Sequence, residues 1–289
     1  MSTQLPRIFD GLVDDAAVFP PGSASVPDAL AAHRQHRVAW YADLVGPLLL
    51  PASAVSNGAL DGRTEPGAGL PIGLIGDTGI ERLPAVLDRL GRDDGVRVRQ
   101  LEAPVAKRGE DPQPGLAGLV RLAAQRTELD CYAEVPLSFG LLAALDTIAG
   151  ARAGGCRIAA KFRTGGLAAE LFPTPVELAA VICACRDRDV PFKLTAGLHH
   201  GLRHTDSETG FTHHGFVNVL AATAAAIDGA EVADVAELLG TTDPLRVVDP
   251  VRTRRDGVRP LWIGFGSCSV VEPLTDLIRL GLVNGGFES

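Results

Sequence analysis

The chain has 289 residues, of which 46% are hydrophobic and 21% are charged, and its formal net charge is −8. This balance, without a block of like charge, argues against non-specific binding to nucleic acid, and no apolar run reaches the roughly 18 residues that span a membrane. The N-terminus lacks the pattern of a signal peptide, and five cysteines without a CxxC pair indicate reduced thiols. We therefore expect a cytoplasmic protein.

Short apolar runs alternate with segments of helical period along almost the whole chain. Seven runs are predicted to be strands: 46–51, 70–76, 96–104, 130–137, 156–165, 191–199 and 260–267. An eighth strand fits within residues 8–19. The predicted helices are 79–91, 115–127, 139–151, 174–189, 215–227 with 230–240, and 272–283.

Strand and helix alternation is typical of βαβ units and a parallel sheet. Eight such units in this length favour the α/β class, with one (β/α)8 TIM-like barrel domain over residues 1–289. The segment of about residues 1–40 is expected to pack on the barrel. A doubly wound sheet is the alternative, but no GxGxxG follows an early strand.

Charged residues stand near the carboxyl ends of four predicted strands, where active sites of such barrels lie. Lys161 and Arg163 share one face of their strand, and Lys193 is flanked by Phe192 and Leu194, which belong to the opposite face. The apolar faces should pack on the helices, which directs the charges into the barrel. We predict four catalytic residues: Lys161, Lys193, Glu134 and Glu102. The alternative is a structural ion-pair network among the same side chains.

The last predicted strand runs through a Gly-Ser turn into a helix, an arrangement that offers donors and a helix dipole to an anion. Simple capping of the helix by a serine is the alternative. The predicted substrate-binding residues, for a phosphate or carboxylate group, are Arg163, Thr164, Gly165, Gly166, Thr195, His199, His200, Gly266, Ser267 and Ser269.

The stretches KFRTGG, FKLTAGL and GFGSCS, within about the last 110 residues, resemble the last three strands of Schiff-base class I aldolases of the deoxyribose-phosphate aldolase type. The resemblance implies that Lys161 forms the Schiff base and that Lys193 lowers its pKa. Glu134 or Glu102 would then shuttle the proton. Arg163 departs from the family, which has a small residue there. With DDAAVFPPG, the motifs are also similar to a group of uncharacterised bacterial (β/α)8-barrel proteins.

Five of the seven histidines lie in one stretch and are a candidate site for a divalent metal such as Zn or Mn: His199, His200, His204, His213 and His214. Acid–base or substrate-binding histidines and ordinary loop residues are the alternatives, and the stretch is a candidate lid. Asp14 and Asp15 either stabilise the barrel or pair with a cation of the site. His33 and His36 are expected on a solvated helix face.

These patterns predict an enzyme that acts on a small anionic carbonyl compound, phosphorylated or carboxylated, as a lyase of aldolase type or an isomerase with a Schiff base on Lys161 and no cofactor. One alternative is a metal-dependent hydrolase or isomerase that uses the histidine cluster. Another is a non-catalytic barrel that binds a small anion. No nucleic-acid or membrane partner is expected, and a homo-oligomer is an open possibility.

Overall fold

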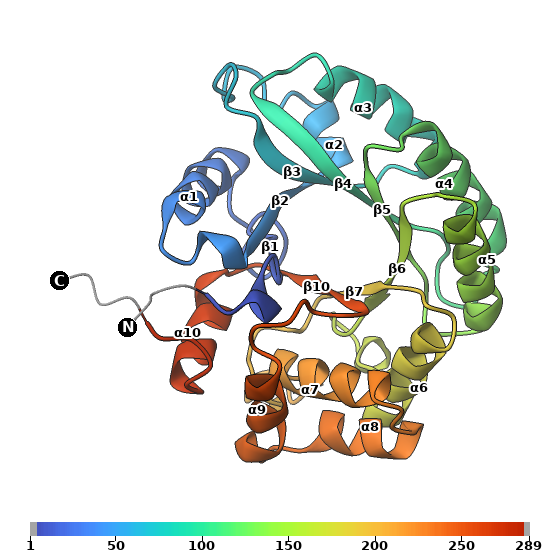
Figure 1. The fold of residues 1–289 in the computed structure, drawn as a ribbon. Helices are drawn as coiled ribbons and strands as arrows, with labels where there is room; N and C mark the ends of the chain where they lie inside the picture. The colour runs from blue at the N-terminus through green and yellow to red at the C-terminus, as the bar shows by residue number, and fades with distance from the viewer. Residues whose placement is uncertain (1–4, 286–289) are drawn as a thin grey trace.

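The structure is a computed structural model and describes residues 5–285. Eight parallel strands pair in the order β1-β10-β7-β6-β5-β4-β3-β2 and close into a barrel (Figure 1). They are β1 (Val13–Asp15), β2 (Val45–Pro51), β3 (Leu70–Ile75), β4 (Val96–Pro104), β5 (Asp130–Glu134), β6 (Ile158–Arg163), β7 (Phe192–Thr195) and β10 (Trp262–Ser267). The predicted (β/α)8 barrel is therefore confirmed, and the doubly wound sheet is wrong.

Helices surround this barrel (Figure 1). Their bounds are α1 (Val26–Val38), α2 (Ala52–Ser56), α3 (Leu83–Leu90), α4 (Gln113–Gln125), α5 (Leu141–Ala153), α6 (Pro175–Arg186), α7 (Phe216–Ile227), α8 (Val232–Gly240), α9 (Pro244–Thr253) and α10 (Val271–Arg279). Between β7 and β10 the chain adds a short antiparallel hairpin, β8 (His204–Thr205) with β9 (Thr212–His213). No helix of residues 5–285 has both the length and the apolar character needed to cross a membrane.

Strands β6 and β7 show the predicted alternation. Phe162 and Phe192 belong to the hydrophobic core and pack on each other with ring centroids 6.2 Å apart. Lys161 and Lys193 are direct register partners on the opposite face of the two strands. Strand β7 is shorter than predicted, because Ala196 has a φ of 63° and cannot continue an extended strand. The strand therefore ends two residues beyond Lys193.

The first strand is a three-residue segment, and it closes the barrel between β2 and β10. Asp14 pairs in register with Gly266, and Asp15 turns to the other face. There the Asp15 carboxylate lies 3.0 Å from Nδ1 of His33, which has no exposed surface. The expectation that His33 lies on a solvated helix face is wrong, because this buried contact joins α1 to β1.

Candidate active site

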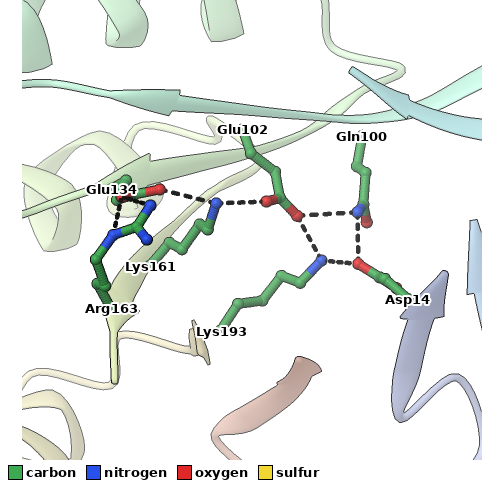
Figure 2. A network of polar contacts seen from close by, with 7 residues as sticks. All are labelled: Asp14, Gln100, Glu102, Glu134, Lys161, Arg163 and Lys193. Atoms are coloured by element: carbon green, nitrogen blue, oxygen red, sulfur yellow. Dashed lines mark hydrogen bonds and ion pairs between the residues drawn. The ribbon is translucent and has the colours of Figure 1, made fainter. Parts of the chain in front are cut away.

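Lys161 lies inside the barrel and is only 4% exposed. Its Nζ atom is 2.7 Å from Oε2 of Glu102 and 2.8 Å from Oε2 of Glu134 (Figure 2). Glu134 on β5 is the register partner of Lys161, and Glu102 comes from β4, the next strand along. Three neighbouring strands therefore deliver one ammonium group and two carboxylates to one place.

Lys193 extends this cluster toward β1 (Figure 2). Its Nζ atom donates to Oε1 of Glu102 over 2.7 Å and forms a short ion pair with Asp14. Glu102 thus bridges the two lysines, with one carboxylate oxygen for each. The Nζ atom of Lys193 also lies 4.6 Å from the centroid of the Tyr132 ring, a cation–π contact.

Two members of this cluster are new relative to the predicted catalytic set. Gln100 Nε2 donates to Asp14 Oδ2 over 2.7 Å and to Glu102 Oε1 over 3.0 Å. Gln100 lies two residues before Glu102, so both side chains point to the same face of β4. Strand alternation in the sequence could therefore have identified Gln100 as a member of the site. Asp14 fits beside Gly46 on β2, where an added Cβ would lie 2.0 Å from the Asp14 carboxylate. Asp14 therefore pairs with a lysine of the site, which was one of the two roles open for it.

The ionised forms of Glu102, Glu134 and the two lysines stabilise one another, whereas at Asp14 burial outweighs the effect of Lys193 and raises the pKa of the carboxyl above its ordinary value. Burial alone would raise the pKa of Glu102, but Lys161 and Lys193 lower it to about 2. Burial would lower the pKa of Lys161, but Glu102 and Glu134 raise it above its ordinary value. The expectation that Lys193 lowers the pKa of Lys161 is therefore wrong for this arrangement, because Glu102 stands between the two ammonium groups.

Glu134 connects the buried cluster to a pocket of about 290 Å³ between the loops that follow β4, β5 and β6. Its Oε1 atom accepts from Nε of Arg163 at 3.4 Å and from Nη2 of Arg163 at 3.3 Å. The Arg163 side chain is 45% exposed and lines the same pocket. Burial would raise the pKa of Glu134, but Lys161 and Arg163 hold it below its ordinary value.

The sequence uses lysine sparingly, which was a further signal for this site. Only three of the 27 basic residues are lysines, and the other 24 are arginines. Lys161 and Lys193 are buried in the barrel, and Lys107 lines the pocket. A guanidinium keeps its charge at any ordinary pH, whereas an amine can lose a proton and react. The two buried lysines are therefore the cations of this network whose side chains can exist as neutral amines.

The predicted substrate-binding residues near β6 and β7 serve partly to join the two strand ends. Thr164 is fully buried, and its hydroxyl donates to the carbonyl oxygen of Ala196 over 2.7 Å. A Cβ on Gly165 would lie 2.8 Å from Cα of Gly197, and one on Gly166 would lie 2.3 Å from the Leu171 side chain. Thr195 pairs in register with Gly266 of β10. These contacts account for the small residues without a ligand.

Gly266 and Ser267 end β10, and a short turn leads from them to the start of α10 at Val271. The Ser267 hydroxyl donates to the carbonyl oxygen of Ser269 over 2.7 Å, and the backbone N–H of Glu272 donates to the Ser269 hydroxyl over 3.2 Å. Cys268 lies between them, with its sulfur 3.7 Å from Nδ1 of His199. Only the Ser269 hydroxyl thus contacts the first turn of α10, whereas the Ser267 hydroxyl stays within the turn. The anion-binding role of this turn stays a prediction.

The five clustered histidines separate into smaller groups. His204 stacks on His213 with ring centroids 5.1 Å apart and meets His200 edge-on at 4.6 Å. His199 contacts Glu272 near α10, and His214 is buried against the carbonyl oxygen of Pro173. Within residues 5–285, no group of three or more His, Cys, Asp or Glu side chains is arranged to hold a metal ion. The metal alternative therefore gains no support from this geometry.

Neither a scan against protein-family models nor a search of the curated proteins found a match for this chain. The likeness of its last three strands to Schiff-base aldolases is therefore still an expectation.

Proposed function

We propose that the protein is a lyase of aldolase type, or an isomerase, that acts on a small anionic carbonyl compound through a Schiff base on Lys161. The observation that carries the proposal is the position of Lys161 between Glu102 and Glu134 at the carboxyl ends of the barrel strands, beside a second buried lysine. Catalytic sites of barrel enzymes lie at this end, and such clusters of shifted pKa values are typical of them.

The lysine must first lose its proton, because only the neutral amine attacks a carbonyl carbon. Glu134 is the base in contact with Lys161 that also lines the pocket. In the proposed step it takes a proton from the Lys161 ammonium, and the free amine then forms a C–N bond to the carbonyl carbon. Glu134 passes this proton to the former carbonyl oxygen and then carries a second proton there from Nζ of the adduct. The oxygen leaves as water, and the iminium ion keeps one N–H.

The iminium ion then accepts the electron pair of a neighbouring C–H or C–C bond as that bond breaks, which leaves an enamine on Lys161. In the first case the proton passes to Glu134; in the second, the hydroxyl on the departing carbon gives its proton to Glu134, and that fragment leaves as a second carbonyl compound. Lys193 stays protonated in this scheme, because Asp14 and Glu102 raise its pKa against the effect of burial. Its role is to hold Glu102 in place, so that a fixed negative charge faces Lys161 and the iminium ion that replaces its ammonium group.

The raised pKa of Lys161 supports a second candidate, a barrel that binds a small anion without chemistry. In that case the ammonium group would keep its proton and contribute only its charge. Such a protein would gain thermal stability from an anionic ligand without forming a covalent adduct.

Borohydride trapping separates the two candidates, because it reduces an imine to a stable amine. We expect intact-mass and peptide-mass measurements to show one adduct on Lys161 after incubation with small anionic carbonyl compounds and borohydride. Lys107 is the matched control, because it lines the neighbouring pocket but lacks the two carboxylates. Lys161→Met should abolish the adduct, and Lys107→Met should leave it unchanged. An adduct confined to Lys107, or full turnover by Lys161→Met, would contradict the proposal.

A further inference from the structure

Arg163 stands at the carboxyl end of β6, two residues after Lys161 (Figure 2), and it lines the pocket together with Glu134. Both of its contacts with Glu134 go to the same oxygen, at 3.3 and 3.4 Å. Ion pairs of this kind with good geometry are bidentate and measure about 2.7–2.9 Å. The guanidinium is thus held loosely and keeps its capacity for a planar anion.

The carboxylate of Glu134 bridges the two cations. Its Oε2 atom contacts Lys161 at 2.8 Å, while its Oε1 atom contacts Arg163. Lys161 Nζ and the Arg163 guanidinium are therefore separated by the width of one carboxylate group. A ligand that offers a carbonyl carbon to Lys161 and an anion to Arg163 must carry the two groups almost side by side.

We infer that the substrate is a short oxo acid whose carboxylate is attached to the carbonyl carbon or lies one carbon away, and that Arg163 binds this carboxylate in place of Glu134. The inference rests on the proposed Schiff base at Lys161 and adds the class of substrate. A phosphate on a sugar-like carbonyl compound is bulkier and lies farther from the carbonyl carbon, so it fits this spacing poorly.

Exchange of the anion on Arg163 also prepares the chemistry. When the carboxylate of the oxo acid takes over Arg163, Glu134 keeps only Lys161 as a partner and accepts its proton more readily. One proton moves from Nζ to Glu134 before the C–N bond forms, and a second one follows from Nζ of the adduct. Glu134 passes both in turn to the carbonyl oxygen, which leaves as water. Arg163 thereby acts as a binding residue that links substrate capture to activation of Lys161.

The rest of the pocket carries charges of both signs. Lys107 and Arg108 line it, and neither side chain has a carboxylate within 4.0 Å among residues 5–285. Glu170 and Glu177 lie on the same wall, so the charge is mixed, and the Arg108 guanidinium donates to the carbonyl oxygen of Glu170 over 2.6 Å. A small monoanion therefore suits the pocket better than a polyanion.

A series of carbonyl probes tests this inference with the full chain. The probes are pyruvate, acetoacetate and levulinate, in which the carboxylate lies progressively farther from the carbonyl group, together with acetone and dihydroxyacetone phosphate. We expect borohydride to trap pyruvate or acetoacetate on Lys161 at concentrations at least about tenfold lower than levulinate or acetone. Arg163→Gln should remove this preference, so that pyruvate and acetone label Lys161 at similar concentrations. Arg108→Gln is the matched control in the same pocket and should keep the preference.

A second readout is the rise in melting temperature with pyruvate, which reports binding whether or not an imine forms. If probes label Lys161 but oxo acids have no advantage, or if Arg163→Gln keeps that advantage, the oxo-acid inference is overturned and the Schiff-base proposal stands. A different result would be that pyruvate raises the melting temperature of the wild type but not of Arg163→Gln, while no probe labels Lys161. In that case the carboxylate site stands and the Schiff base is overturned. Absence of both labelling and stabilisation overturns both.

Discussion

Lys193 shows at the residue scale how the cluster balances its charges. The side chain is 2% exposed, and its ammonium group is shared by Asp14 and Glu102. Three carboxylates and three cations make up the connected set, since Lys161, Lys193 and Arg163 face Asp14, Glu102 and Glu134. Burial of these charges is tolerated because each has a partner of opposite sign.

Removal of Lys193 should therefore cost far more than removal of an exposed cation. Lys193→Met leaves Asp14 and Glu102 without one of their partners, and we expect it to lower the free energy of unfolding by about 3 kcal/mol or more. Arg157→Met is the control, because the Arg157–Asp130 pair is about half exposed and should be worth less than about 1 kcal/mol. Urea unfolding measures both values. Equal losses in the two variants would show that the buried network is not a coupled unit.

A second residue, Asp15, holds α1 on the barrel. One of its oxygens faces Nδ1 of His33, and the other accepts from the backbone N–H of Ala17 over 3.1 Å. Asp15→Ala leaves the buried ring nitrogen of His33 and the part-buried N–H of Ala17 without this partner, and we expect a loss of about 2 kcal/mol in the free energy of unfolding. Asp15→Asn keeps an acceptor oxygen and should lose less. Thermal and urea unfolding compare the two variants, and an equal loss in both would contradict this role.

At the scale of elements, the loops after β6 and β7 come into direct backbone contact. Gly197 has a φ of 77°, and an added Cβ would lie 2.9 Å from the carbonyl oxygen of Thr164. Gly210 in the hairpin loop has a similar φ of 71° but open space at the same position. The two glycines therefore share the conformational requirement and differ only in packing.

This pair gives a matched prediction. Gly197→Ala should destabilise the protein by about 1–3 kcal/mol more than Gly210→Ala, because the extra methyl group forces the ends of β6 and β7 apart. The change should also slow borohydride labelling of Lys161, which lies three residues before Thr164. Chemical unfolding and labelling rates check the two effects. If Gly210→Ala is as costly as Gly197→Ala, the close approach of the two loops is not what limits this position.

Much of this element arrangement was predictable from the sequence, because helical period and apolar runs are local signals. The residues that share a face on β6 and on β4 follow from strand alternation alone. Helix α9 was not predicted, because Pro244 and Pro250 interrupt the helical pattern. The helix forms nevertheless, and Pro244 lies in its first turn, where proline is favourable. The burial of His33 was missed for a different reason, because its partner Asp15 belongs to another element.

At the scale of the whole molecule, barrel closure decides which distant residues meet. Asp14 and Lys193 are far apart in sequence, and only the pairing of β1 with β10, which in turn pairs with β7, brings them into contact. Strand alternation predicts that each side chain points inward, but it contains no information about register across the closing seam. The lysines and glutamates of the site were therefore predictable as a set, whereas their bridging pattern was not.

The assembled network should also make the free energy of unfolding fall as the pH is lowered below about 4.5. The two lysines lower the pKa of Glu102 from 4.5 to about 2, so its ionised form contributes stability that is complete above about pH 4.5. That contribution, about 3 kcal/mol by linkage, is lost as the pH falls toward 2.

The variant Glu102→Gln isolates this effect from the other carboxylates, because Gln resembles the protonated acid. We expect the difference in unfolding free energy between wild type and Glu102→Gln to be largest at neutral pH, constant down to about pH 4.5 and progressively smaller toward pH 2. Urea unfolding across this range measures it. A difference that stays constant to about pH 2, or one that grows as the pH falls, would mean that Glu102 is not held ionised by Lys161 and Lys193.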